Sequence, residues 1–103
     1  MPAVARLTDV FTDTDVIATG SGNVFVNGLP VARLTDMTTG HSLPGHTTYP
    51  PVPITVGSGS VFVNGLPIAR LGDKHDVHCD TGHPASDCHD AAISSASGNV
   101  FAG

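Results

Sequence analysis

The chain has 103 residues, enough for one domain, and a chain of this length buries only about 60–65% of its unfolded surface, which limits it to a small core. It contains no Glu, Gln or Trp but 12 Gly and 8 Pro, a composition that favours short strands and tight turns over helices. A net charge of −5 with four basic residues argues against nucleic-acid binding, and no apolar run reaches the length of about 20 residues that a membrane helix requires.

The N-terminal segment, residues 1–6, has neither the basic start nor the apolar stretch of a signal peptide. We therefore expect the chain to be made in the cytosol. Cysteines in that compartment are usually kept reduced, so Cys79 and Cys88 are expected to be thiols.

Two sequence blocks recur along the chain and divide it into three repeats. The first block, Val-Ala-Arg-Leu-Thr-Asp, begins at Val4 and returns at Val31 and, as Ile-Ala-Arg-Leu-Gly-Asp, at Ile68. The second block carries the string Val-Phe-Val-Asn-Gly and lies at residues 20–30 and 57–67, with a truncated copy at 96–103. The chain is therefore predicted to be a single domain, residues 1–103, whose repeats span approximately 3–29, 30–66 and 67–103.

Each repeat is predicted to form a β-hairpin. Val-Phe-Val is a short strand, and the pairs Asn27-Gly28 and Asn64-Gly65 tolerate the positive φ of a two-residue hairpin turn. The third copy stops at Gly103 without a returning strand, and residues 3–7 form a strand without a partner. We therefore expect an all-β fold in which the two termini meet and close three near-equivalent faces around a pseudo-threefold axis, leaving few exposed strand edges.

Two further residue types recur at fixed repeat positions. Each arginine has an aspartate three residues later, which we interpret as a structural ion pair; the alternative, a substrate-binding arginine triad, has no other support in the sequence. Phenylalanines also share one repeat position and are predicted to be packing residues. The arginines are Arg6, Arg33 and Arg70, and the phenylalanines are Phe25, Phe62 and Phe101.

The three connections that follow the first block differ in length and composition. The first covers residues 10–19, whereas the second (37–56) and third (74–95) are long, and long connections in small domains are usually functional. All histidines and cysteines lie in these two: His41, His46, His75, His78, Cys79, His83, Cys88 and His89. A Zn²⁺ ion bound by imidazole and thiolate groups from both would tie together loops that apolar burial alone cannot order.

Other interpretations of the same residues stay open from spacing alone. The histidines could lie on the surface beside two inert thiols, or Cys79 and Cys88 could form a disulfide. Asp9, Asp13 and Asp15 resemble half of a calcium loop, but no closing bidentate residue follows them. A zinc hydrolase, which needs an open coordination position, and a metal-sequestering module, which needs exposed ligands, are the alternative functions.

Together these features resemble the PAAR-repeat family, named for a Pro-Ala-Ala-Arg motif that appears here at residues 30–33 and 67–70, with a degenerate copy at 3–6. The resemblance covers essentially the whole chain. Members form a small sharp cone that caps the trimeric β-helical spike of contractile phage tails and of type VI secretion systems. Residues 39–41, 49–51 and 78–89 look most like the phage versions.

The resemblance also implies a metal site near the apex of that cone. The family usually holds zinc through three His and one Cys, which on this chain match His41, His78, Cys79 and His89. This set predicts one structural Zn²⁺ ion, with iron as the other metal considered, in a closed tetrahedral site without catalysis. His46, His75, His83 and Cys88 are the residues that could replace one of these ligands.

The implied function is a structural, membrane-piercing tip at the end of a virion tail spike or of a secreted injection spike. It would bind through its base to a trimeric spike protein, either VgrG-like or a phage tail-spike β-helix, and contact the target-cell envelope transiently. The repeats support this independently, because a monomer with three near-equivalent faces matches the end of a threefold trimer. The chain is expected to be a monomer by itself and, ending at Gly103, to carry no fused toxin domain.

Overall fold

The computed structural model describes residues 1–42, 48–79 and 88–103, and this part of the chain consists of short antiparallel β pairs. Four hairpins are joined by single β-bridges, and each hairpin pairs two consecutive strands. The strands are β1 (Phe25–Val26), β2 (Leu29–Pro30), β3 (His41–Ser42), β4 (Thr48–Tyr49), β5 (Phe62–Val63), β6 (Leu66–Pro67), β7 (His78–Cys79) and β8 (Cys88–His89). The predicted all-β class is confirmed.

The β1–β2 and β5–β6 hairpins have the turns that the sequence predicts. Asn27 and Asn64 both have a φ of 54°, and the glycines that follow them have φ values of 79° and 78°. Two consecutive residues with positive φ define the type I′ turn, whose twist suits a two-residue hairpin. The Asn-Gly pairs therefore set the register of both hairpins.

A closed ring of backbone hydrogen bonds surrounds the pseudo-threefold axis. The amide of Ala5 donates to the carbonyl of Ala69 (3.0 Å), that of Ala69 to Ala32 (3.0 Å), and that of Ala32 to Ala5 (3.1 Å). All three side chains are completely buried. The small side chain at the centre of each motif is therefore enclosed where the three strands meet around the axis.

The rest of the core repeats the same contacts three times. Ile17, Ile54 and Ile93 are buried, and their amides donate to the carbonyls of Asp9, Asp36 and Asp73 at 2.9 Å in every repeat. The buried apolar residues form two clusters along the axis. One contains Ala5, Phe11, Ile17, Ala32, Ile54, Ala69, Ala91 and Ile93, and the other contains Val4, Val31, Val63, Ile68 and Ala102.

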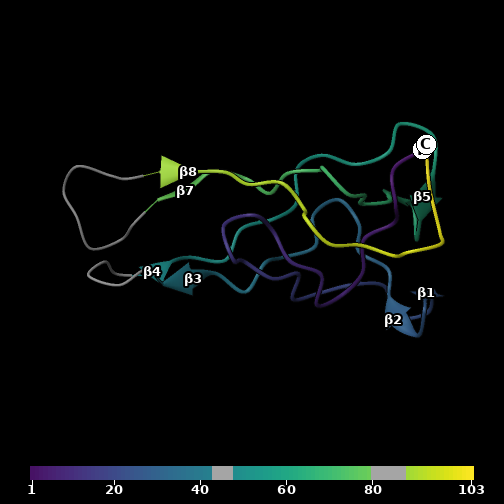
Figure 1. Ribbon diagram of the computed structural model, residues 1–103, viewed down its shortest axis with the longest axis horizontal. Helices are drawn as coiled ribbons and strands as arrows, with labels where there is room; N and C mark the ends of the chain where they lie inside the picture. Colours follow the sequence, from purple (N-terminus) through teal and green to yellow (C-terminus); the bar gives the residue numbers. More distant parts are fainter. Residues whose placement is uncertain (43–47, 80–87) are drawn as a thin grey trace.

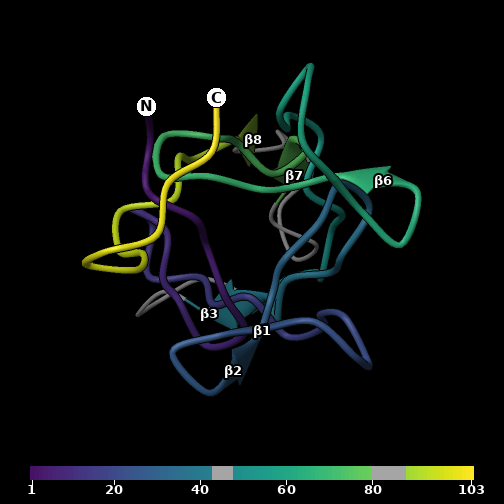
Figure 2. The same cartoon turned by 90° about the vertical axis from the view of Figure 1, so that its right-hand side faces the viewer.

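The two termini meet as the sequence predicts. Ala3 forms an antiparallel bridge with Phe101, and the amide of Val4 donates to the carbonyl of Val100 at 2.8 Å. Figure 2 shows the two chain ends next to each other on one side of the triangular outline. The N-terminal strand therefore supplies the return strand that the truncated third repeat lacks.

The repeat arginines form structural ion pairs, as predicted. In each repeat the aspartate three residues later accepts hydrogen bonds from Nε of the arginine (3.0 Å) and from the backbone amide of the same arginine (2.7–2.8 Å). The second carboxylate oxygen accepts from the outer guanidinium nitrogen at 3.0–3.1 Å. Each pair closes the tight turn that follows the axial strand, so the guanidinium groups have a packing role at all three corners.

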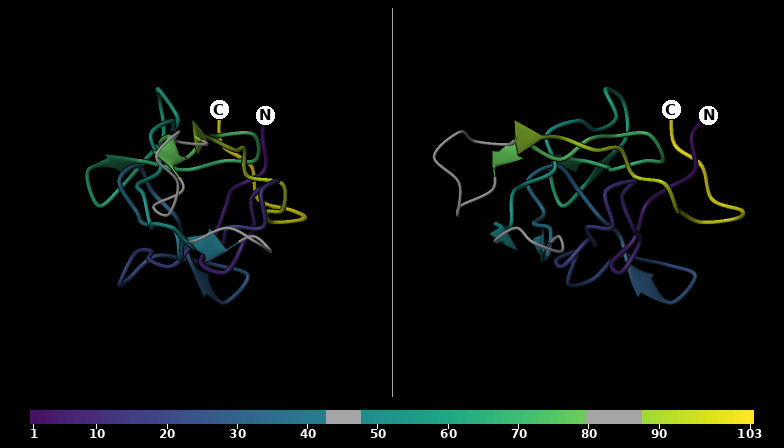
Figure 3. Two further views of the ribbon diagram at one scale, coloured as in Figure 1. Left: turned by 90° about the vertical axis from the view of Figure 1, so that its left-hand side faces the viewer. Right: turned by 60° about the vertical axis from the view of Figure 1, so that its left-hand side comes forward.

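The molecule is elongated, with principal extents of 41 × 23 × 23 Å (Figure 1). We call the end that carries β1, β2, β5, β6 and both termini the basal end. The end that carries β3, β4, β7 and β8 is the apical end. Seen along the long axis from either end, the chain has a three-cornered outline (Figures 2 and 3).

The repeat phenylalanines are not core residues. The prediction that they pack internally is wrong, because Phe25, Phe62 and Phe101 are 55%, 55% and 51% exposed. Phe25 and Phe62 begin strands β1 and β5 of the basal hairpins, and Phe101 pairs with the N-terminal strand. The basal end therefore presents one large aromatic side chain from each of the three repeats to solvent.

No helix in the described ranges is long and apolar enough to cross a membrane.

Candidate metal centre

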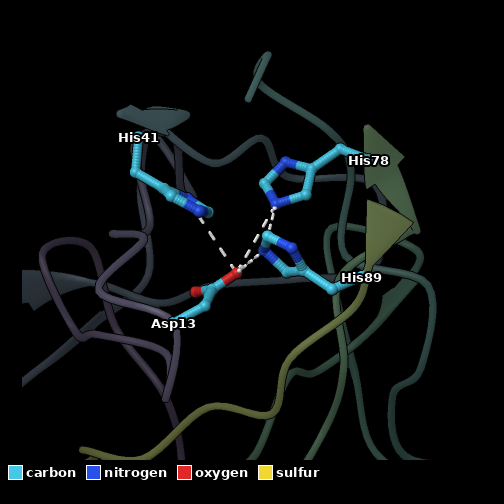
Figure 4. Close-up of side chains that lie close together, drawn as sticks. All are labelled: Asp13, His41, His78 and His89. Carbon is cyan, nitrogen blue, oxygen red and sulfur yellow. Dashed lines mark hydrogen bonds and ion pairs between the residues drawn. The ribbon is translucent and has the colours of Figure 1, made fainter. Parts of the chain in front are cut away.

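Three connections, one from each repeat, meet at the apical end. Their side chains Asp13, His41, His78 and His89 lie close together, and we call this group the apical cluster. The β3–β4 and β7–β8 hairpins bring in His41, His78 and His89, and the short first connection brings in Asp13 from a turn closed by the bridge between Val10 and Val16. Figure 4 shows the three imidazole rings gathered above the carboxylate of Asp13. His41 and His78 occupy the same position in successive repeats, five residues after the aspartate of the corner ion pair.

The register of the β7–β8 hairpin places its two histidines on one face and its two cysteines on the other. His78 pairs with His89 and Cys79 pairs with Cys88, in mirror order across the hairpin. Neighbours on a strand point to opposite faces, so the two histidines face the cluster and the two cysteines face away from it. The cysteines form a disulfide.

This arrangement corrects two predictions. Cys79 and Cys88 are not free thiols, and Cys79 offers no thiolate to a metal because its sulfur is bonded to Cys88. The same bond removes Cys88 as a replacement ligand. The disulfide was one of the alternatives that spacing left open, and the palindromic order His-Cys…Cys-His was the signal for it. Antiparallel pairing of the two histidines places the cysteines directly opposite each other.

The hydrogen bonds of His78 define which of its ring nitrogens carries a lone pair. Its Nδ1 lies 2.9 Å from the carbonyl oxygen of Pro50, so Nδ1 carries the proton and donates it. The neutral ring then has its lone pair on Nε2, which points into the cluster. That atom lies 3.0 Å from Nε2 of His89 and 3.5 Å from Oδ2 of Asp13. A histidine held in this tautomer by a backbone carbonyl is typical of metal ligands.

Both ring nitrogens of His41 are buried and have no hydrogen-bond partner among the described residues. Its Nδ1 lies 3.9 Å from Oδ2 of Asp13, and its ring stacks on Tyr49 with centroids 4.9 Å apart. Burial lowers the pKa of His41, against the opposing attraction of the Asp13 and Asp15 charges. The ring is therefore held mainly in the neutral form, which is the form that binds metals.

Gly40 explains how His41 comes so close to the opposite strand. Its φ is +74°, and a Cβ atom at this position would lie only 2.6 Å from the carbonyl oxygen of Tyr49. Glycine adopts this backbone conformation without strain and leaves room for the carbonyl. The turn into β3 therefore depends on the missing side chain.

Asp13 is a candidate metal ligand that the sequence suggested only for calcium. Its Oδ2 lies 3.0 Å from Nε2 of His89 and 2.8 Å from Nε2 of His75. Burial opposes ionisation of Asp13. Hydrogen bonds from His75 and from the backbone amide of Asp15 outweigh it and lower the pKa of Asp13. The carboxylate is therefore ionised at the centre of the imidazole groups.

The donor set fits a divalent cation. Ligand atoms of Asp13, His41, His78 and His89 lie within 4.8 Å of one another. Three neutral imidazoles and one carboxylate are ligands that first-row divalent metals accept. The two unpaired nitrogens of buried His41 are otherwise costly, and a cation would satisfy one of them.

The remaining alternative ligands divide into two groups. His75 lies beside the cluster and is buried. His46 and His83 lie outside the described residues.

Comparison with models of known protein families identifies the family to which the repeats belong. The PAAR motif model matches residues 44–103, which is more than half of the chain. The chain belongs to the PAAR-motif family. In this PAAR chain, three of the four residues that the resemblance implies as metal ligands, His41, His78 and His89, lie in one group with Asp13 that could hold a metal ion, whereas Cys79 is bonded to Cys88. No curated protein matches the chain.

Proposed function

We propose that this PAAR chain is the structural tip of a contractile injection machine, where it caps the trimeric β-helical spike of a phage tail or of a type VI secretion-like particle. Membership of the family supports a spike-tip role. The motifs at residues 39–41 and 49–51 favour the phage-like version within this proposal. The role is mechanical and non-catalytic, and the tip reaches its place by assembly onto the spike.

The observation that carries the proposal is the threefold basal end. Phe25, Phe62 and Phe101 are more than half exposed and come from the same position of three repeats. Exposed aromatic side chains are typical of interfaces, because they bury a large apolar area with little loss of side-chain freedom. One chain with three equivalent contacts matches a trimer end without leaving two of its three subunits uncovered.

The cation centre supplies rigidity at the opposite end. Asp13, His41, His78 and His89 come from all three connections, so one ion would tie each repeat to the other two at the apical end. A structural metal in a small domain contributes directly to the free energy of folding. A tip that is driven through an envelope needs such rigidity. Zinc and iron both accept imidazole and carboxylate ligands.

The test is capture by the trimeric spike encoded with this chain. The isolated chain is expected to sediment as a monomer in analytical ultracentrifugation and to bind one per spike trimer. Phe62→Asp places a charge in the proposed interface and should weaken capture at least 100-fold.

A matched control is Val56→Asp. Val56 is 43% exposed and lies outside the basal hairpins, at a repeat position that carries Thr19 and Ser95 in the other two repeats. This variant should bind the spike as the unmodified chain does. A stable self-trimer, or equal capture of the Phe62 and Val56 variants, would contradict the proposal.

A further inference from the structure

The three corners of the basal end are not equivalent. At the first two corners, Nη1 of the repeat arginine donates to the side-chain carbonyl of a turn asparagine: Arg6 to Asn27 and Arg33 to Asn64, both at 3.1 Å. The third repeat carries Gly103 at the position of these asparagines. The side-chain carboxamide that completes the first two corners is therefore missing at the third.

The same asparagines also join neighbouring repeats. Nδ2 of Asn27 donates to Oδ1 of Asn99 at 3.0 Å, and Nδ2 of Asn64 donates to Oδ1 of Asn23 at 2.8 Å. Each carboxamide thus accepts a hydrogen bond from an arginine and donates one to the next repeat. At the third corner Ser60 takes the place of Asn23 and Asn99, so its hydroxyl faces the position that lacks a carboxamide.

The third arginine keeps its ion pair but has a free donor. Nε and Nη2 of Arg70 bind Asp73 at 3.0 and 3.1 Å, as in the other repeats. Nη1 of Arg70 has no hydrogen-bond partner in the described part of the chain. A Cβ atom at Gly103 would meet only Sδ of Met1 and Oγ of Ser60, both at an ordinary contact distance of 3.7 Å. The third corner can therefore accept another side chain without rearrangement.

This open corner adjoins the aromatic surface of the basal end. Gly103 follows Phe101 by two residues, just as Asn27 follows Phe25, and Phe101 is 51% exposed. A partner that covers Phe101 therefore comes close to Nη1 of Arg70 and removes its water. An arginine N–H that loses water without gaining an acceptor weakens binding, so the partner must bring an acceptor to this corner.

We propose that the third corner takes the carboxamide of an Asn or Gln side chain from the spike subunit that covers Phe101. Its oxygen accepts from Nη1 of Arg70, and its nitrogen donates to Oγ of Ser60, which reproduces the contacts of the other two corners. A carboxamide fits better than a carboxylate, because Asp73 already balances the charge of Arg70. This inference rests on the proposed function and names the group that the spike contributes.

The proposal predicts that one corner of the tip contributes more to spike affinity than its pseudo-symmetric equivalents. Asn27 and Asn64 already fill their own corners, so the two other spike subunits find no open position there. Because the three spike subunits are identical, any one of them can supply the carboxamide. The tip therefore binds equally well in each of three orientations on the trimer.

A matched pair of arginine variants tests the proposal through capture by the trimeric spike encoded with this chain. Arg70→Lys and Arg6→Lys each remove the planar fork that binds an aspartate, so their melting temperatures should fall by similar amounts. Arg70→Lys should also weaken capture about tenfold, the value of one hydrogen bond to a charged group. Arg6→Lys should bind as tightly as the unmodified chain, because Asn27 occupies that corner.

A second pair fills the open corner from within the chain. Gly103→Asn supplies the chain's own carboxamide, displaces that of the spike and should weaken capture about tenfold. Gly103→Ala is the control and should bind as the unmodified chain does, since its Cβ makes only ordinary contacts.

Equal capture of Arg70→Lys and Arg6→Lys would overturn the proposal, and so would equal capture of Gly103→Asn and Gly103→Ala. If the loss in Arg70→Lys disappeared at about 1 M salt, where exposed charges are screened, the spike group would be a carboxylate and the carboxamide would be wrong. A spike that failed to capture the unmodified chain would instead overturn the proposed function.

Discussion

Around the pseudo-threefold axis, the three repeats place the same residue type in the same contact, as the ring formed by Ala5, Ala32 and Ala69 shows. At the apical cluster the repeats differ. The position of His41 and His78 is Thr14 in the first repeat, which contributes the neighbouring Asp13 instead. The axial core is apolar and satisfies its own hydrogen bonds, whereas the cluster leaves buried side-chain atoms of Asp15 and His41 without a hydrogen-bond partner in the described part of the chain. The residues that recur in all three repeats therefore form the scaffold, and the residues that differ between repeats form the candidate metal site.

The largest expected effect is a loss of metal from the apical end, with the axial core left intact. His41→Ala removes a ligand from the second connection, so metal content measured by mass spectrometry of the native protein should fall from one ion per chain to well below one. Lys74→Ala is the control, because its side chain is 55% exposed and pairs only loosely with Asp90 at 3.9 Å. Full metal content in the His41 variant would show that the ion lies elsewhere.

The next largest effect is a loss of stability in the axial core, with metal binding at the apical end retained. Ala32→Leu adds a large side chain where three backbones meet, and overpacking of this kind costs about 1–3 kcal/mol of the free energy of unfolding. Chemical denaturation should show this loss in the metal-loaded chain. The ion is held by other residues. The unfolded fraction of the variant should therefore rise, while each folded chain still binds one ion. A variant as stable as the unmodified chain would contradict the close packing at the axis.

The disulfide separates the stability of the apical end from metal binding, because it lies at that end but is not part of the cation centre. Replacing both cysteines, as Cys79→Ser with Cys88→Ser, should cost at most about 2–3 kcal/mol, the loop-closure entropy of a bridge that spans nine residues of sequence. Metal content should stay at one ion per chain, since neither sulfur faces the cluster. Loss of the ion from this variant would instead assign Cys79 as a ligand, as the family resemblance implies.

The smallest effect concerns the turn that positions His41. Gly40→Ala should destabilise the chain by about 1–2 kcal/mol, because the residue has positive φ and its Cβ would lie 2.6 Å from the carbonyl oxygen of Tyr49. Gly22→Ala is the matched control. A Cβ at Gly22 meets nothing within 4 Å, so thermal unfolding of that variant should be unchanged. Equal melting temperatures for both variants would show that the approach of β3 to β4 tolerates a side chain.

The scaffold was predictable because its signals are local or repeated. The Asn-Gly turns, the corner ion pairs and the unpaired strand at residues 3–7 each follow from short sequence strings. Exposure of the phenylalanines was not predictable in the same way. An apolar side chain at a repeated position serves an internal core or an external interface equally well, and only the packed structure separates the two.

The site was predictable only in part. His41, His78 and His89 could be named because they match a family motif and lie in the long connections. Asp13 was considered only for calcium and not with the histidines, because it lies in the short connection, which carries no histidine or cysteine, and only the fold brings it next to the other two connections. Cys79 was misassigned because the strand alternation of β7, which turns it away from His78, depends on a hairpin register that spacing alone did not define.

Hydrogen–deuterium exchange with and without a chelator tests most directly whether an ion ties the apical connections to a core that packs without it. Removal of the ion should speed exchange of the amides in β3, β4, β7 and β8 at least tenfold. The amides of Ala5, Ala32 and Ala69 should keep their protection. Uniformly faster exchange would mean that the axial core also depends on the ion, and unchanged exchange throughout a chain that had held an ion would contradict the cation centre as a structural staple.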